Sequence, residues 1–188
     1  RSIGQRRKGG RAKPVRLDYT GYTSIMLPIT IRPYRPDELE AVARLWQDTI
    51  LATVDYVPLI RTYTWEGNQA YFRENVAAKY DIWVAEADGD LAGFVALRDG
   101  VIDELFVRVD RHRQGIGTAL LEHAKRLSPN GLTLMTFQQN AQARAFYEKH
   151  GFRAVRFGVS PAPESVPDVE YHWSEQQDDT GDGAITSE

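Results

Sequence analysis

The chain has 188 residues, a formal net charge of −3 and no cysteine. Its length suits a single domain with a buried core, and the lack of cysteine excludes disulfides, thiolate metal sites and a cysteine nucleophile. No stretch approaches the roughly 18 uninterrupted apolar residues of a membrane span, and no secretory signal is visible. We therefore expect a cytoplasmic protein that has no membrane partner.

Charge is distributed unevenly along the chain. Residues 1–25 carry a local charge of +6, which leaves −9 for the remainder. A basic arm is one signature of nucleic-acid binding, but we expect residues 1–25 to be a disordered or non-native leader and predict no nucleic-acid partner. Residues 26–173 are the expected folded domain. Residues 174–188 are acidic and nearly free of apolar side chains, so we expect a disordered tail.

The hydrophobic pattern predicts strands and helices in a definite order. Residues 29–34 are a predicted strand, and residues 36–50 and 66–79 are predicted helices. Three strands, at 81–87, 91–97 and 101–108, are separated by Asp-Gly turns that indicate hairpins. A helix from 116, a strand at 132–138, a helix at 141–150 and strands at 152–157 and 169–173 complete the chain. This order predicts an α+β fold with a mixed sheet.

The run His112-Arg113-Gln114-Gly115-Ile116-Gly117 joins the strand at 101–108 to the following helix. The unpaired N–H groups and the dipole of a first helical turn attract anions, and glycines let a bulky anion approach the backbone. The loop therefore indicates a phosphate or pyrophosphate site. A dinucleotide fingerprint would need a third glycine where Leu120 stands, and a nucleotide-triphosphate loop needs Gly-Lys-Ser/Thr, of which only Thr118 is present.

A second segment, Asn140-Ala-Gln-Ala-Arg-Ala-Phe-Tyr-Glu-Lys-His-Gly-Phe152, matches the pattern Asn-x-x-Ala-x-x-Phe-Tyr-Glu-x-x-Gly-Phe. Together with the glycine loop it resembles the Gcn5-related N-acetyltransferases (GNAT), whose loop pattern is Arg/Gln-x-x-Gly-x-Gly/Ala. His112 departs from that pattern at its first position. The resemblance covers residues 29–173 and implies the GNAT fold, a mostly antiparallel sheet of about seven strands that is splayed between strands 4 and 5 and flanked by about four helices.

The resemblance implies acetyl-CoA as co-substrate and no metal. The pyrophosphate would lie on the glycine loop and the thioester arm along the fourth strand. The residues expected to bind the cofactor are Phe106, Val107, Arg108, His112, Arg113, Gln114, Gly115, Ile116, Gly117, Thr118, Asn140 and Tyr147. Asn140 is equally well placed to be the N-cap of the helix at 141–150, and His112 either reaches a phosphate or lies in solvent.

Two residues are the candidates for acid–base chemistry. The resemblance implies that the Tyr147 hydroxyl protonates the departing CoA thiolate, for which a phenol is suited because it keeps its proton at neutral pH. Glu104 is the favoured general base for the attacking amine. Strand alternation predicts that Asp103 points away from Glu104. A water chain is an equal alternative as base, and Asp168 and Glu170 are outside candidates.

The acceptor is expected to bind between the loop at 52–65 and the connection at 160–167, where the resemblance implies the substrate site. Tyr56, Tyr63 and Trp65 suggest an aromatic pocket for an aromatic, apolar or cationic amine. Small amines, amino acids, antibiotics and peptide amines all remain open as acceptors, and the resemblance allows a homodimer. The predicted function is acetyl transfer to a primary amine in a ternary complex, and the alternative is a non-catalytic acyl-CoA-binding domain.

Overall fold

The computed structural model describes residues 28–175. The predicted basic leader and all but the first two residues of the predicted acidic tail lie outside that range. Seven strands form one sheet in the order β1-β2-β3-β4-β5-β7-β6, and all neighbours are antiparallel except β4 and β5. The strands are β1 (Ile29–Pro33), β2 (Asp81–Ala87), β3 (Asp90–Arg98), β4 (Val101–Val107), β5 (Leu132–Phe137), β6 (Arg153–Val159) and β7 (Pro167–Trp173).

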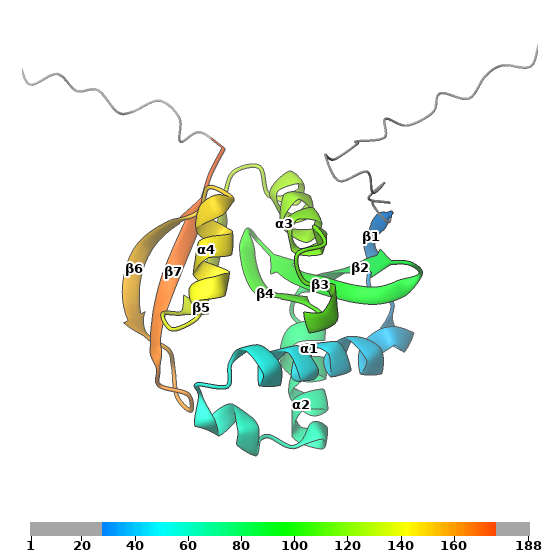
Figure 1. Cartoon of the computed structure of the whole chain (residues 1–188), viewed down its shortest axis with the longest axis horizontal. Helices are drawn as coiled ribbons and strands as arrows, with labels where there is room; N and C mark the ends of the chain where they lie inside the picture. The colour runs from blue at the N-terminus through cyan, green and yellow to red at the C-terminus, as the bar shows by residue number, and fades with distance from the viewer. Residues whose placement is uncertain (1–27, 176–188) are drawn as a thin grey trace, which may run out of the picture.

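Helices cover the two faces of the sheet (Figure 1). The α-helices are α1 (Leu39–Thr53), α2 (Trp65–Tyr71), α3 (Ile116–Leu127) and α4 (Ala141–Lys149). Three short 3₁₀ turns, η1 (Pro36–Glu38), η2 (Pro58–Thr62) and η4 (Val109–Arg111), and a π-helix, η3 (Phe72–Ala77), complete the list. The helix predicted at 66–79 therefore consists of two segments, since α2 continues into η3. The loop predicted at 52–65 contains η2. The fold predicted from sequence is otherwise confirmed.

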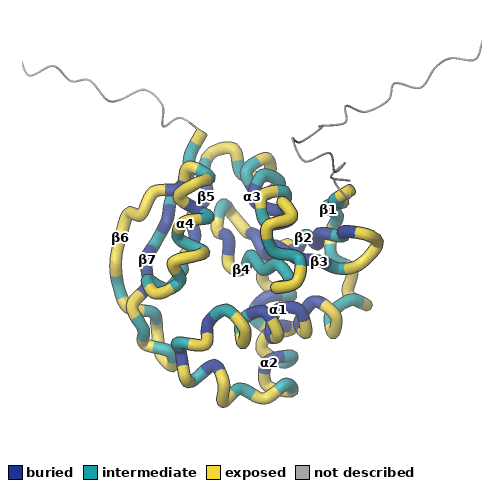
Figure 2. Tube along the Cα trace, viewed as in Figure 1, coloured by how far each residue is buried: buried dark blue, intermediate teal, exposed yellow. Residues whose placement is uncertain are grey.

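Alternation along β3 divides the core into two layers. Val95 and Leu97 pack with α3 and α4, whereas Phe94 and Ala96 pack with α1, α2 and η3, because successive strand side chains point to opposite faces. Figure 2 shows the buried segments concentrated in the central strands, while β6 is an exposed edge. Both layers hold β4 in place from opposite sides.

The sheet opens between β4 and β5. These strands pair at only two positions, Val101 with Thr133 and Ile102 with Leu134, and then diverge (Figure 1). The rest of β4, from Asp103 to Val107, therefore has β3 as its only strand neighbour. This opening was expected from the family resemblance, and it positions the site described below.

A β-bulge in β4 corrects one prediction about its carboxylates. Ala96 pairs with Glu104 but Leu97 pairs with Ile102, so Asp103 is the extra residue. A bulge interrupts alternation: Ile102 before Asp103 and Leu105 after Glu104 both pack in the α3–α4 layer, which leaves Asp103 and Glu104 together on the other face. The prediction that these two side chains point in opposite directions is therefore wrong.

Candidate active site

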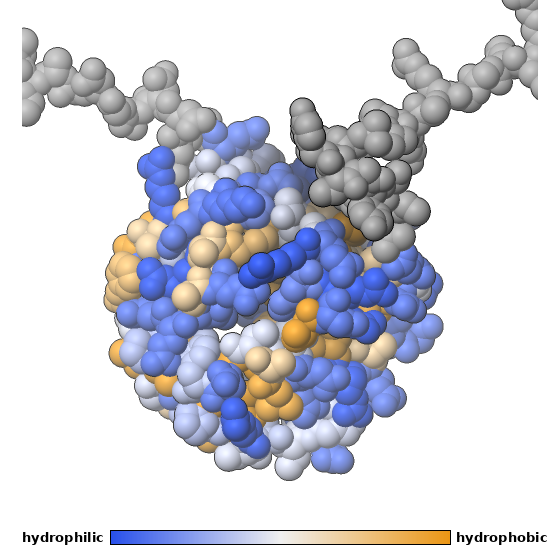
Figure 3. Space-filling view, in the orientation of Figure 1, coloured by the Kyte–Doolittle hydropathy of each residue, from blue (hydrophilic) through white to orange (hydrophobic). Residues whose placement is uncertain are grey.

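One large cavity lies at the opening of the sheet. It has a volume of about 1090 Å³ and is bounded by the end of α1, the end of β4, the glycine loop and one face of α4. Figure 3 shows this hollow between α1 and the helices above it. The segments that surround it are far apart in sequence and are brought together only by the fold.

The glycine loop forms one wall of the cavity. Gly115 is the N-cap residue of α3 and has φ +86°. Residues other than glycine rarely adopt this backbone conformation. A Cβ on Gly117 would lie 3.5 Å from the Phe146 ring, so the helix start packs closely against α4. The N–H groups of the first turn of α3 lack partners within the helix and line the cavity together with Thr118. This wall is suited to an anion.

The end of β4 forms a second wall. Arg108 N–H donates to Ala92 O on β3, so the antiparallel pattern directs the backbone groups of Phe106 toward β3 as well. The groups of Leu105 and Val107 then point to the side where β5 has diverged. An extended polar arm could hydrogen-bond there to the backbone groups of Leu105 and to Val107 N–H, since Val107 O already accepts from His112. This alternation assigns the backbone contacts with the cofactor to Leu105 and Val107, and not to Phe106 and Arg108.

His112 ties the loop to this strand. Its Nε2 lies 2.8 Å from Val107 O, and its Nδ1 lies 3.5 Å from Gln142 Nε2 on α4. Because a carbonyl oxygen only accepts, Nε2 carries a proton and donates it to Val107 O. The ring is thus held inside the cavity wall and bridges the loop, β4 and α4.

We expect His112→Ala to weaken acetyl-CoA binding about fivefold, the effect of losing one hydrogen bond that orders the loop. Calorimetric titration with acetyl-CoA measures this Kd. His172→Ala is the matched control, since His172 lies on β7 outside the residues that line the cavity and its Nε2 contacts Glu170 at 2.7 Å. Equal Kd values for His112→Ala and the wild type would contradict the bridging role.

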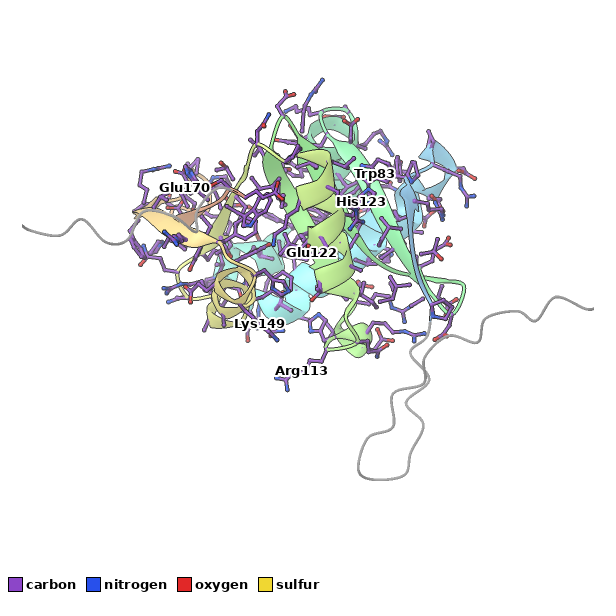
Figure 4. The ribbon with its side chains drawn as sticks, turned by 90° about the horizontal axis from the view of Figure 1, so that it is seen from above. Trp83, Arg113, Glu122, His123, Lys149 and Glu170 are labelled. Carbon is purple, nitrogen blue, oxygen red and sulfur yellow. The ribbon has the colours of Figure 1, made fainter. Side chains whose placement is uncertain are left out.

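Unpaired basic side chains border the cavity. Arg113 and Lys149 are exposed, line its mouth and make no ion pair with any residue in 28–175. Figure 4 shows Arg113 projecting from the loop before α3 and Lys149 on the neighbouring α4. Arg108, in contrast, is paired with Asp110 at 2.7 Å, and Arg111 with Asp88 at 2.9 Å. The free cations add a positive field to the anion-binding wall.

Two polar contacts close the wall on the α4 side. Asn140 Oδ1 accepts from Ala143 N at 3.0 Å, so it is the N-cap of α4 while also lining the cavity. The Thr118 hydroxyl lies 3.1 Å from His150 Nε2, and His150 Nδ1 donates to Phe146 O at 2.7 Å. The Thr118–His150 contact joins the start of α3 to the C-terminal end of α4.

Tyr147 and Glu104 lie in opposite layers of the core, and only Tyr147 lines the cavity. Tyr147 lines the cavity from α4 and is 8% exposed, and its pKa is raised, first by burial and then by the charge of Glu104. Glu104 lies on the α1 side of β4, and burial raises its pKa well above the ordinary value, with a further contribution from Asp103. The pair consists of a phenol that keeps its proton and a carboxylate with enhanced affinity for one.

Known proteins resemble this chain in sequence and in fold. A family model described as an acetyltransferase (GNAT) domain matches residues 78–154. Peptidyl-lysine N-acetyltransferase YjaB of Salmonella typhimurium is 37% identical over 128 residues, which are 68% of this chain and 85% of that protein. Peptidyl-lysine N-acetyltransferase YiaC of Escherichia coli is 33% identical over 66% of this chain and 84% of its own length.

The chain belongs to the GNAT acetyltransferase family. The solution structure of apo-form YjaB from Escherichia coli superposes with a TM-score of 0.67 and 28% identity, covering 78% of this chain and 97% of that one. The structure of yncA from Salmonella typhimurium with its cofactor acetyl-CoA has the same fold, with a TM-score of 0.59 and 16% identity, covering 83% and 99%.

Acetyl-CoA is the co-substrate expected of a GNAT acetyltransferase, and the cavity of this chain fits that molecule. The glycine loop offers amides and cations to the pyrophosphate, and the open edge of β4 offers backbone groups to the amides of the pantetheine arm. Of the helices in residues 28–175, none has the length and apolar character needed to cross a membrane. Within the same range no cluster of His, Asp or Glu could hold a metal ion.

The predicted substrate residues of the acetyltransferase lie in three different settings. Tyr56 lines the cavity and packs edge-on against Phe137 at 6.2 Å. Tyr63 lies outside the residues that line the cavity and donates its hydroxyl to Glu164 at 2.8 Å. Trp65 packs under the Arg44 guanidinium at 3.5 Å, a contact within the helical layer. The acceptor role of all three stays a prediction.

The outside candidates for the base have other partners or positions. Glu170 pairs with Arg156 at 2.8 Å and with His172 at 2.7 Å, and its pKa is lowered by these contacts. Asp168, on β7, is buried beside Gly158 of β6. Neither residue lines the cavity, and Glu104 also lies outside its lining, but Glu104 is the carboxylate whose charge reaches Tyr147. Trp46 and Tyr71 lie near Glu104, but their helical spacing in the sequence is that of core residues and does not predict this position.

Proposed function

We propose that this enzyme transfers the acetyl group of acetyl-CoA to the Nε amine of lysine side chains in peptides or proteins, by direct attack in a ternary complex. Two relatives that share about two thirds of this chain at 33% identity or more are peptidyl-lysine N-acetyltransferases. The observation that supports the chemistry best is the buried Tyr147 in the cavity wall, with Glu104 on the other face of β4 near enough for its charge to add to the effect of burial on the pKa of Tyr147.

Glu104 is the proposed general base, directly or through a water. A lysine amine has an ordinary pKa near 10.4 and is charged at neutral pH, so it must lose a proton before it can attack. A carboxylate whose pKa is raised well above its ordinary value holds that proton more firmly than a solvated one and is the better base. The negative charge of Glu104 also attracts the ammonium form to the opening.

Tyr147 is the proposed general acid. The thioester supplies an activated acetyl carbon: a carbon–nitrogen bond forms and the carbon–sulfur bond breaks. Tyr147 gives its proton to the leaving sulfur, and the proton lost from the new amide nitrogen restores the phenol. Its raised pKa keeps the phenol protonated across the physiological range. The open β4 edge would align the thioester with the amine, which lowers the entropic barrier.

We expect the protein to release CoA in the presence of acetyl-CoA and a lysine-containing peptide whose N-terminus is blocked. The same peptide with arginine in place of lysine is the control and should give no release above background, because arginine keeps its charge. A thiol-detection assay measures turnover, and mass spectrometry locates the acetyl group. Acetylation confined to small amines or to free peptide N-termini would contradict the proposal.

A further inference from the structure

A hydroxyl and an imidazole meet in the wall of the cavity, at the start of α3. The Thr118 hydroxyl oxygen lies 3.1 Å from His150 Nε2, and both residues line the cavity. Thr118 belongs to the first turn of α3, whose N–H groups lack partners within the helix and suit an anion. Its side chain is exposed, so a ligand in the cavity can reach the hydroxyl. The position of the proton between these two atoms therefore decides what this part of the wall offers to an anion.

The other ring nitrogen fixes the tautomer of His150. Its Nδ1 lies 2.7 Å from Phe146 O, and because a carbonyl oxygen only accepts, Nδ1 carries a proton. In the neutral ring, Nε2 then holds a lone pair and accepts the Thr118 proton. The Thr118 oxygen is left with lone pairs only, which repel the oxygens of a phosphate. In the protonated ring, Nε2 donates to the Thr118 oxygen, and the hydroxyl proton is free to turn toward the cavity.

The charged groups around His150 come from three segments. On α3, the Lys125 ammonium donates to His150 O at 2.9 Å and pairs with Glu122 at 3.0 Å. Lys149 on α4 and Arg113 on the loop before α3 both line the cavity (Figure 4). Among residues 28–175, no carboxylate pairs with the His150 ring. A positive charge on this ring therefore has no carboxylate to offset it, and an anion in the cavity would do so.

We propose that His150 is a positioning residue that couples the binding of acetyl-CoA to the uptake of a proton. Protonated His150 makes the Thr118 hydroxyl a donor for a phosphate oxygen of the cofactor and places a positive charge behind it. Neutral His150 withdraws that donor. Because linkage is reciprocal, the ring also binds its proton more tightly once the anion is present. The inference concerns the cofactor alone and does not depend on which amine is the acceptor.

Dephospho-CoA is the probe for this coupling. It keeps the pyrophosphate and lacks the 3′-phosphate, a phosphomonoester that would itself titrate near about pH 6. Imidazole is the side chain that changes its charge between about pH 5 and 8. We expect the Kd to fall about tenfold between about pH 8 and about pH 5.5, the effect of one hydrogen bond to a charged group. Calorimetry near neutral pH, in phosphate-free buffers of different ionisation enthalpy, should show a net uptake of protons on binding.

Variants assign the proton to the Thr118–His150 pair. His150→Gln keeps an amide that can reach the hydroxyl but cannot titrate, so the pH dependence of Kd and the proton uptake should both disappear. Thr118→Val should reduce both, since the hydroxyl is lost and the ring charge remains, whereas Thr118→Ser should keep both. His172→Gln removes an imidazole outside the cavity and should behave as the wild type. His112 also lines the cavity, and any proton that it binds would persist in His150→Gln.

The outcomes separate a coupled proton from a merely structural role. A Kd for the wild type that does not change with pH, or that falls as pH rises, would overturn the proposal. So would a pH dependence and a proton uptake that survive unchanged in His150→Gln, even if that variant binds more weakly at every pH. Thermal unfolding checks that each variant is folded. Acetylation of lysine peptides would leave the proposed function intact under any of these results.

Discussion

Tyr147→Phe should lower kcat by about 100-fold while the Kd for acetyl-CoA stays unchanged, because a positioned general acid contributes about that factor or more. The substitution removes only the hydroxyl. The ring keeps its contacts with Phe146 at 5.3 Å and Phe152 at 5.6 Å, so the fold and the cavity wall should be preserved. Steady-state kinetics with a lysine peptide and calorimetry with acetyl-CoA measure the two quantities separately.

Phe146→Leu is a useful comparison for Tyr147→Phe. Phe146 lies against Gly117 and the His150 ring, so its loss should disturb the glycine loop and raise the Kd for acetyl-CoA. Tyr147→Phe should thus change kcat, whereas Phe146→Leu should change the Kd for acetyl-CoA. An unchanged kcat for Tyr147→Phe would show that the thiolate leaves without this phenol.

Glu104→Gln should lower kcat by about 100-fold, the effect expected from loss of a general base. In the wild type, kcat should rise with pH as Glu104 ionises above its ordinary range, since burial raises its pKa. The variant should lack this limb of the pH profile. Glu40→Gln, at an exposed position of α1, is the control for a charge change in the same layer.

Glu104→Gln should also change stability, in the opposite direction to activity. The folded pKa of Glu104 lies above the unfolded value of 4.5, so between these values the folded state binds more protons and stability falls as pH rises. The wild type therefore has a destabilising contribution from Glu104 above its folded pKa, and this is lost as pH falls toward the unfolded value. Glutamine removes it, so the variant should unfold at a higher temperature near neutral pH.

If Glu104→Gln keeps full activity and the wild-type pH profile, Glu104 is excluded as the general base and a water chain is left in that role. A variant that loses activity but also unfolds earlier than the wild type would contradict the origin assigned to the raised pKa. Measuring kcat and thermal unfolding on one preparation over the same pH range distinguishes these outcomes.

The local features of this protein could be predicted because they arise between near neighbours in the chain. The two Asp-Gly turns are confirmed: Asp88, Gly89, Asp99 and Gly100 all have positive φ, the backbone that a tight hairpin demands. Gly115 also adopts positive φ and begins α3. Apolar spacing in α1 and α3 predicted their buried faces, including Val42, Trp46 and Leu120. The glycine loop and the Asn-to-Phe segment predicted the family.

The arrangement of the acceptor side required the tertiary structure. The bulge that places Asp103 on the same face of β4 as Glu104 depends on the register of β3 against β4. The alternation of side chains within one strand does not reveal that register. Tyr63 meets Glu164 across 101 positions of sequence. His112 can hydrogen-bond to Val107 O because β5 pairs with β4 only at Val101 and Ile102 and leaves this carbonyl without a partner on β5.

The sequence by itself determined the helices, the turns and the anion-binding loop, since steric limits on φ and the period of apolar residues act over a few residues. Only the tertiary structure decided which charges face the opening and which side chains are already paired. Those facts depend on strand register and on contacts between remote segments, where a shift of one residue exchanges the two faces of a strand. The glycine loop could therefore be predicted from the sequence, whereas the residues that surround the opening became apparent only in the fold.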